Sequence, residues 1–105
     1  MRTLTYKVVG QRLIPTGDHT GLMAGSVGYL QASFEFDNNW KDCKKVASFY
    51  SNGDEHAVLL NEDGSCTIPP EAITKSTFEV RVEGRKTDYR IQTNRIKEKQ
   101  SGGDI

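Results

Sequence analysis

Apolar and polar residues alternate with a period of two along several stretches of the chain, and this pattern limits the folds open to it. Alternate side chains of a β-strand point to the same face, so each stretch has one apolar face and one polar face. The apolar members of the three clearest stretches are Leu4, Tyr6 and Val8; Leu30, Ala32, Phe34 and Phe36; and Phe78, Val80 and Val82. Such half-buried strands are typical of antiparallel sheets.

Clusters of Gly, Asn and Asp separate these stretches at intervals of about ten residues, as in all-β domains. The strongest turn signals are Asn52-Gly53 and Asp63-Gly64, because glycine supplies the positive φ that a tight hairpin needs. These turns predict strands over residues 44–50, 55–60 and 65–68.

One short helical turn is predicted near residues 70–75. Pro70 suits a first helical position, where its missing N–H costs nothing, and Glu71 suits the positive end of the helix dipole. The pattern therefore predicts an all-β fold, an antiparallel β-sandwich of about seven or eight strands with this one turn. We expect the sandwich to span residues 1–98. Residues 99–105, which include Ser101-Gly102-Gly103, are expected to form a flexible tail or linker.

The charge balance argues against two classes of partner. Fourteen basic residues balance 14 acidic ones, which is unlike a strongly basic nucleic-acid binder or a polybasic membrane surface. The basic stretch 85–99 alternates as an ordinary strand does, so we interpret it as a solvated sheet face. The apolar runs are far shorter than the roughly 20 residues that span a bilayer, which predicts no membrane insertion.

The residues with reactive side chains do not form a recognisable catalytic or metal motif. His19 and His56 are far from Cys43 and Cys66 in the sequence, and no pair has the two-to-five-residue spacing of paired zinc ligands. We therefore expect no catalytic residue, no metal and no cofactor, with both histidines at the surface. Without an apolar secretion signal, the two cysteines are expected to be free thiols.

The stretch 32–49 concentrates the aromatic residues and contains Trp40, the only tryptophan. We interpret its phenylalanines as core, and Trp40 as the residue that closes the end of the core at a strand connection while its indole N–H reaches a loop carbonyl. The alternative is that Trp40 stacks on a sugar, with Tyr29 or Tyr50 as further weak candidates for glycan binding.

The order of these motifs resembles a family of small Ig-like β-sandwich domains in structural proteins of bacteriophages and prophages of Gram-positive bacteria. After the aromatic strand and tryptophan, the matching residues are Lys45, Ala47 and Phe49; Cys66, Ile68, Pro69 and Ile73; Thr93 and Asn94; and Ser101-Gly102. The resemblance covers residues 27–102. One departure is Asp42-Cys43, where the family commonly has a glycine after the tryptophan, so the turn there is expected to differ. The cysteines do not flank the tryptophan, so no antibody-type disulfide is expected.

The resemblance implies a virion structural protein that is not an enzyme. Such domains are usually N-terminal modules of tail-fibre, baseplate or head-fibre proteins, and they anchor or space an appendage involved in host attachment. The implied partners are other virion proteins, with homo-oligomers in the full-length protein, and host-surface glycans bound through other domains. The implied location is the virion, assembled in the host cytoplasm.

Two alternatives from other classes stay open. The first is a carbohydrate-binding module of a phage or bacterial cell-wall-associated protein. The second is a redox or metal enzyme that uses Cys43 and His56. Likeness of fold does not decide between them, because one fold serves many functions.

Overall fold

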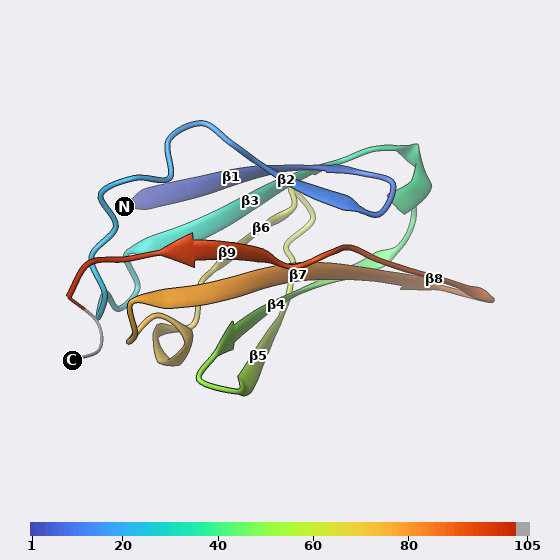
Figure 1. Cartoon of the computed structure of the whole chain (residues 1–105). Coiled ribbons are helices and arrows are strands. Elements are labelled where there is room, and N and C mark those ends of the chain that lie inside the picture. Colours follow the sequence, from blue (N-terminus) through green and yellow to red (C-terminus); the bar gives the residue numbers. More distant parts are fainter. Residues whose placement is uncertain (103–105) are drawn as a thin grey trace.

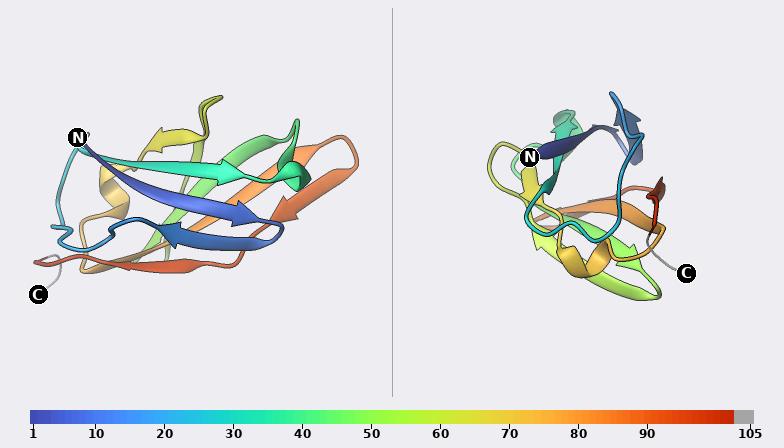
Figure 2. Two further views of the ribbon diagram at one scale, coloured as in Figure 1. Left: turned by 90° about the horizontal axis from the view of Figure 1, so that it is seen from above. Right: turned by 90° about the vertical axis from the view of Figure 1, so that its left-hand side faces the viewer.

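The computed structural model describes residues 1–102, and these form two β-sheets packed face to face (Figures 1 and 2). The strands of sheet 1, in spatial order, are β2 (Arg12–Thr16), β1 (Arg2–Val9), β3 (Leu30–Phe36) and β6 (Ser65–Thr67). The strands of sheet 2 are β5 (Asp54–Leu59), β4 (Lys44–Ser51) and β7 (Thr77–Lys86), followed by β8 (Tyr89–Gln92) and β9 (Ile96–Lys99), which both pair with β7. The predicted all-β sandwich is confirmed.

The core lies between the sheets and includes most of the side chains that the alternation assigned to it, while Phe36 is only partly buried. The buried positions of β1 are Leu4, Tyr6 and Val8, and those of β7 include Phe78 and Val80. Because each strand turns alternate side chains inward, the two sheets bury their apolar faces against each other. The predicted core faces of these strands are therefore confirmed.

Glycine-containing turns set the registers of the short strands. Asn52 and Gly53 both have positive φ, 53° and 85°, and connect β4 to β5 as a two-residue hairpin that the Ser51–Asp54 pair closes. Gly64 has φ 84°, and a Cβ there would lie 2.4 Å from the Phe34 carbonyl oxygen. Both predicted turns are present, each with glycine where a side chain would be strained.

One pair of strands corrects the expectation that the strands are antiparallel. β1 and β3 lie side by side in parallel, with Leu4 opposite Ala32. Residues 17–29 carry the chain from the end of β2 around the start of β1, where the Arg2 N–H donates to the Tyr29 carbonyl at 2.9 Å. Parallel neighbours need a long connection, and this loop completes it at the end of the molecule where the N-terminus lies (Figure 1). The other pairs of named strands are antiparallel.

Strands β8 and β9 form one line along β7 that is interrupted at Thr93 and Asn94. The Val82 N–H donates to Thr93 Oγ1, and the Thr93 N–H donates to the Val82 carbonyl. Asn94 instead accepts the N–H of Leu13 in β2 at 2.9 Å. This pair therefore ties β7 of sheet 2 to β2 of sheet 1, and the interruption acts as a bulge.

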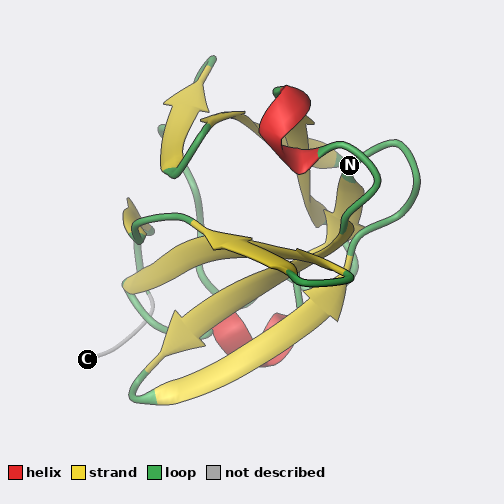
Figure 3. Ribbon diagram, turned by 90° about the vertical axis from the view of Figure 1, so that its right-hand side faces the viewer, coloured by secondary structure: helices red, strands yellow, loops and turns green. Residues whose placement is uncertain are grey.

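The helical content of the described residues consists of short 3₁₀ turns (Figure 3). The turn η2 (Pro70–Ala72) lies where a helical turn was predicted, whereas η1 (Asn38–Trp40) was not predicted. Asp37 caps η1 by accepting the N–H of Asn39. Within η1, Trp40 is fully buried, and its indole N–H donates to the Gly10 carbonyl at 2.8 Å. The predicted role of Trp40 at the end of the core is confirmed.

The packed structure extends past the predicted boundary at residue 98. Gln100 is buried, and its amide Nε2 donates to the carbonyls of Ile73 and Lys75. The Ser101 N–H donates to the Leu22 carbonyl, and the Ser101 carbonyl accepts the Ala24 N–H. Residues 99–101 thus belong to the sandwich, and residues 103–105 of the expected tail lie outside the described residues.

Candidate functional site

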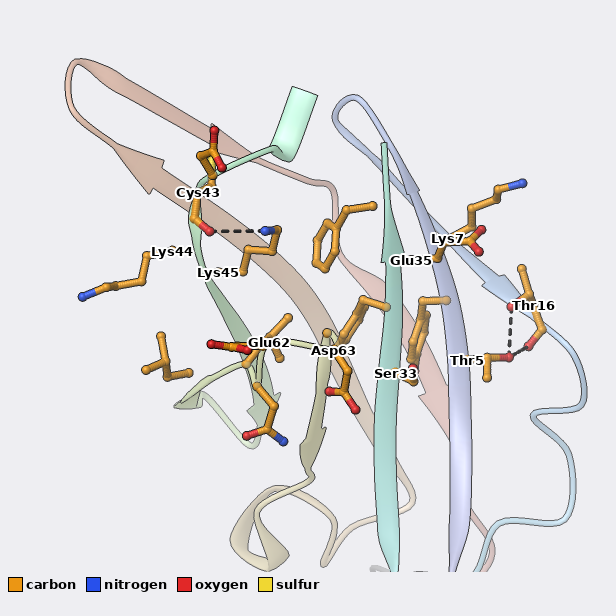
Figure 4. Close-up of a pocket in the computed structure, with 18 residues that line it drawn as sticks. Thr5, Lys7, Thr16, Ser33, Glu35, Cys43, Lys44, Lys45, Glu62 and Asp63 are labelled. Carbon is orange, nitrogen blue, oxygen red and sulfur yellow. Dashed lines mark hydrogen bonds between the residues drawn. The ribbon is translucent and has the colours of Figure 1, made fainter. Parts of the chain in front are cut away.

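An open groove runs along the side of the sandwich between β3 and β4 (Figure 4). It has a volume of about 1110 Å³ and exists because β6 pairs with only Gln31–Ser33 of β3, which leaves the end of β3 uncovered. Lys45 reaches into this gap, where its Nζ donates to the Cys43 carbonyl at 3.2 Å and lies 5.2 Å from the centroid of the Phe36 ring. The Lys45 side chain thus shields Phe36, as an amphipathic side chain does at the rim of a core.

Several polar side chains of the groove make hydrogen bonds within the surrounding structure. Asp63 accepts hydrogen bonds from both the Oγ–H and the N–H of Ser65, and these bonds hold the pKa of Asp63 below its ordinary value. On the opposite rim, Thr5 and Thr16 bond each other across β1 and β2. These contacts stabilise the turn before β6 and the β1–β2 pair.

The most concentrated chemistry lies in a buried cluster of Tyr6, His19 and Glu98, from β1, the loop after β2, and β9. Oε2 of Glu98 accepts the Tyr6 hydroxyl at 2.5 Å and lies 2.7 Å from Nδ1 of His19. The His19 and Glu98 side chains are only 13% and 6% exposed. Burial raises the pKa of the Tyr6 phenol, and the nearby charge of Glu98 raises it further. Tyr6 therefore stays a hydrogen-bond donor.

The partners of His19 determine where its protons lie. Nε2 is 2.9 Å from two carbonyl oxygens, those of Thr5 and Thr16. Because carbonyls only accept, Nε2 must carry a hydrogen. Nδ1 faces the carboxylate of Glu98 at 2.7 Å. The carboxylate of Glu98 thus joins both sheets and the loop, and each ring nitrogen of His19 has a partner in this cluster.

This cluster was missed in the sequence, where His19 was expected at the surface. That expectation is wrong because the partners of His19 are 79 residues away, at Glu98, and 14 residues away, at Thr5. A signal was nevertheless present. Ile96 and Glu98 of β9 and Gln100, which follows the strand, alternate toward the core, so the period-two rule places a carboxylate and an amide inside the sandwich. Polar groups at such positions need buried partners.

The three aromatic candidates for glycan stacking lie apart and in different environments. Trp40 is 0% exposed, so neither face of its ring is available in this structure. The Tyr50 ring is covered by Arg95, whose guanidinium carbon lies 3.7 Å from the ring centroid. Tyr29 is 51% exposed at the end of the loop that precedes β3. The structure does not bring these rings together into one platform.

The two cysteines are buried, whereas His56 lies on the edge strand β5. Cys43 and Cys66 are both buried and free. Burial raises the pKa of the Cys66 thiol to about 11, which makes the reactive thiolate scarce. His56 pairs with Phe49 across the β4–β5 hairpin.

Within residues 1–102, no group of three or more His, Cys, Asp and Glu side chains is placed to hold a metal ion. None of the described helices is long and apolar enough to cross a membrane.

Two backbone positions accommodate Trp40 and the turn from η1 into β4. Asp42 has φ 62°, in the left-handed region that favours glycine. Across the sheet, a Cβ on Gly84 would lie 2.7 Å from Cε3 of the Trp40 ring. Gly84 thus gives the indole room to enter the core, and the turn that follows Trp40 has a backbone that glycine adopts readily.

Comparison with protein-family models, with curated proteins and with solved structures finds no match for this chain. The site is therefore interpreted from its own geometry. Its buried polar groups bond to one another and to the backbone across element boundaries, which is an arrangement for joining elements.

Proposed function

We propose that this domain is a non-enzymatic structural module of a bacteriophage virion, which anchors or spaces a tail, baseplate or head-fibre appendage involved in host attachment. The observation that carries the proposal is where the motif residues lie. Trp40 closes one end of the core on the Gly10 carbonyl, and Thr93 and Asn94 tie the sheets together. Three residues of the phage-family resemblance thus connect separate parts of the sandwich, which supports a structural role.

The one departure from the family pattern is compatible with the same turn. Where the family commonly has glycine, Asp42 adopts a positive φ of 62°. Aspartate is among the few residues that tolerate this conformation. With aspartate in place of the family's glycine, the chain can still follow the same turn from Trp40 into β4. The departure is therefore compatible with the resemblance.

The proposed partners are other virion proteins, with assembly of the full-length protein as a homo-oligomer and a location in the particle. Electron microscopy tests this directly, with a gold-labelled tag on the protein during phage production. We expect label at one fixed position on the particles, on the tail, baseplate or head. Particles without label, alongside labelled protein in the soluble lysate, would exclude the proposal.

A carbohydrate-binding module is the second candidate, and the half-exposed ring of Tyr29 is the observation that favours it. A glycan array with the wild-type domain and the Tyr29→Ala variant discriminates between the two functions. The structural proposal predicts no glycan signal from either protein. The module hypothesis requires a signal that Tyr29→Ala removes and that a matched Tyr89→Ala variant retains.

A further inference from the structure

The two sheets expose four outer edges, and three of them are protected against pairing with another chain. Along β2, Pro15 has no N–H, and the N–H of Leu13 is already bonded to Asn94. Strand β6 has only three residues and is followed by Pro69 and Pro70. The β8–β9 edge is interrupted by its bulge and carries three basic side chains, Arg90, Lys97 and Lys99. Prolines, bulges, short strands and basic residues are the devices that keep strand edges from associating.

Strand β5 has none of these devices. It forms the outer edge of sheet 2 with six residues, Asp54–Leu59, whose sequence DEHAVL contains no proline, lysine or arginine (Figure 1). Its last residue, Leu59, is 59% exposed although it is a large apolar side chain. An edge strand of this kind offers an unpaired template for another strand.

The hydrogen-bond pattern shows which backbone groups of β5 are open. The Leu60 N–H donates to the Lys45 carbonyl at 2.9 Å, which marks that position as a hydrogen-bonded pair of the β4–β5 ladder. Bonded and non-bonded positions alternate in an antiparallel ladder. The N–H and C=O groups of Glu55, Ala57 and Leu59 therefore point away from β4, where no described strand lies.

We propose that β5 pairs antiparallel with β5 of a second copy of this chain, about a two-fold axis through Ala57, which joins sheet 2 of both copies into one continuous sheet. The two Ala57 residues then face each other, and Glu55 of each copy faces Leu59 of the other. This register bonds all three open positions of both strands. A shift of two residues leaves one position of each strand without a partner.

The side chains favour a second copy in this register. Glu55 and Asp54 lie opposite the apolar Leu59 and Leu60, so no like charges meet across the new pair. Lys45 of the neighbouring strand β4 lies opposite Leu60 and on the same face of the sheet. It therefore lies about two strand spacings from Asp54 of the other copy, roughly 10 Å between Cα atoms. This opposite charge attracts the copies, while small Ala57 lets their backbones approach. The inference rests on the strand edge and does not depend on the proposed function.

Sedimentation velocity of the full chain over a concentration series tests the dimer, with charge swaps at the two-fold axis. Ala57→Glu places two carboxylates opposite each other, and Ala57→Lys places two ammonium groups there. Like charges directly opposite destabilise a strand pair and opposite charges stabilise it. We expect the wild type to form dimers and each variant alone to have a dissociation constant at least about tenfold higher. A mixture of the two variants should form dimers again.

Thr3→Glu, on the exposed face of β1, is the matched control and should dimerise as wild type does. Circular dichroism of each variant reports that the fold is kept, because Ala57 is exposed and its N–H is outside the ladder. A wild-type chain that stays monomeric up to about 1 mM, a concentration at which even weak complexes form, would refute the proposal. Dimers that survive Ala57→Glu, or variants that fail to pair when mixed, would refute it as well.

Discussion

At the scale of single residues, Glu98 is the group on which the joint between the sheets depends. Burying a carboxylate costs several kcal/mol unless it is paired and hydrogen-bonded. Here one oxygen accepts the Tyr6 hydroxyl and faces Nδ1 of His19. Tyr6 comes from β1 of sheet 1 and His19 from the loop after β2, whereas Glu98 belongs to sheet 2. The hydrogen bonds that offset the burial of the carboxylate therefore form only when the two sheets are packed together.

Removal of the Tyr6 hydroxyl tests this joint. We expect Tyr6→Phe to lower the free energy of unfolding by about 1.5–3 kcal/mol, as for hydrogen bonds to charged groups. The loss should shrink when Glu98→Gln is already present, because the two residues share one interaction. Urea denaturation of the two single variants and the double variant measures the coupling. Tyr50→Phe is the control, since its exposed hydroxyl lies 3.5 Å from Glu55, and strictly additive losses at Tyr6 and Glu98 would contradict the joint.

Gly84 and Trp40 form a second contact that a single methyl group should disturb. In Gly84→Ala the new Cβ would lie 2.7 Å from the indole, so the ring or strand β7 must move. We expect a loss of about 1–3 kcal/mol from overpacking, together with a change in the fluorescence of Trp40, the only tryptophan. Thr77→Ala on the exposed face of the same strand should leave both properties nearly unchanged. An unaltered fluorescence spectrum in Gly84→Ala would show that the ring does not lie against Gly84.

The buried thiol of Cys66 predicts how stability depends on pH. Its pKa is about 11 in the folded chain and about 8.5 when unfolded. The folded state therefore holds the proton more tightly, so its contribution is complete below about pH 8.5 and is lost as the pH rises toward 11. The slope is about 1.4 kcal/mol per pH unit for one proton. Chemical denaturation between pH 7 and 10 should show this decline in wild type and a smaller one in Cys66→Ala. Equal slopes would contradict it.

At the scale of elements, the connection from β3 through η1 to β4 uses two aspartates in opposite ways. Asp37 accepts the N–H groups of Gly10 and Asn39, at 2.7 and 3.0 Å, and so fixes the start of η1. Asp42, by contrast, occupies a left-handed backbone position at the end of the connection. The first depends on its carboxylate, and the second is constrained by its backbone.

Glycine at each position should therefore have opposite effects. We expect Asp42→Gly to stabilise the domain by about 0.5–1 kcal/mol, because glycine adopts positive φ without strain. The same change at Asp37 should destabilise it by about 1–2 kcal/mol, because the N–H groups of Gly10 and Asn39 lose the carboxylate that accepts them. Thermal and urea unfolding of both variants measures the two effects. Destabilisation by Asp42→Gly would show that the Asp42 side chain makes a contribution larger than the strain.

Elements that depend on local signals could be predicted from the sequence, and those that depend on distant partners could not. The hairpin at Asn52-Gly53 and the role of Trp40 follow from turn chemistry and from alternation. The parallel pairing of β1 with β3 depends on the path of residues 17–29, which no local pattern encodes. The partnership of His19 with Glu98 joins positions that only the folded sandwich brings together.

At the scale of the whole molecule, hydrogen bonds of polar side chains connect the two sheets at several places. Asn94 bonds β2 on one side, Glu98 bonds Tyr6 in the interior, and Trp40 closes one end. Because each of these hydrogen bonds joins segments far apart in the sequence, the domain is expected to unfold as one cooperative unit. Such a cooperative unit is compatible with the structural role that we propose.

The central claim, that this domain is a component of a virion, is tested most directly by quantitative mass spectrometry of gradient-purified phage particles. We predict that peptides of this domain sediment with the particles, at a constant ratio to the major structural proteins in every particle fraction. Peptides found only in the soluble lysate, and absent from particles that carry the other structural proteins in full amount, would contradict it.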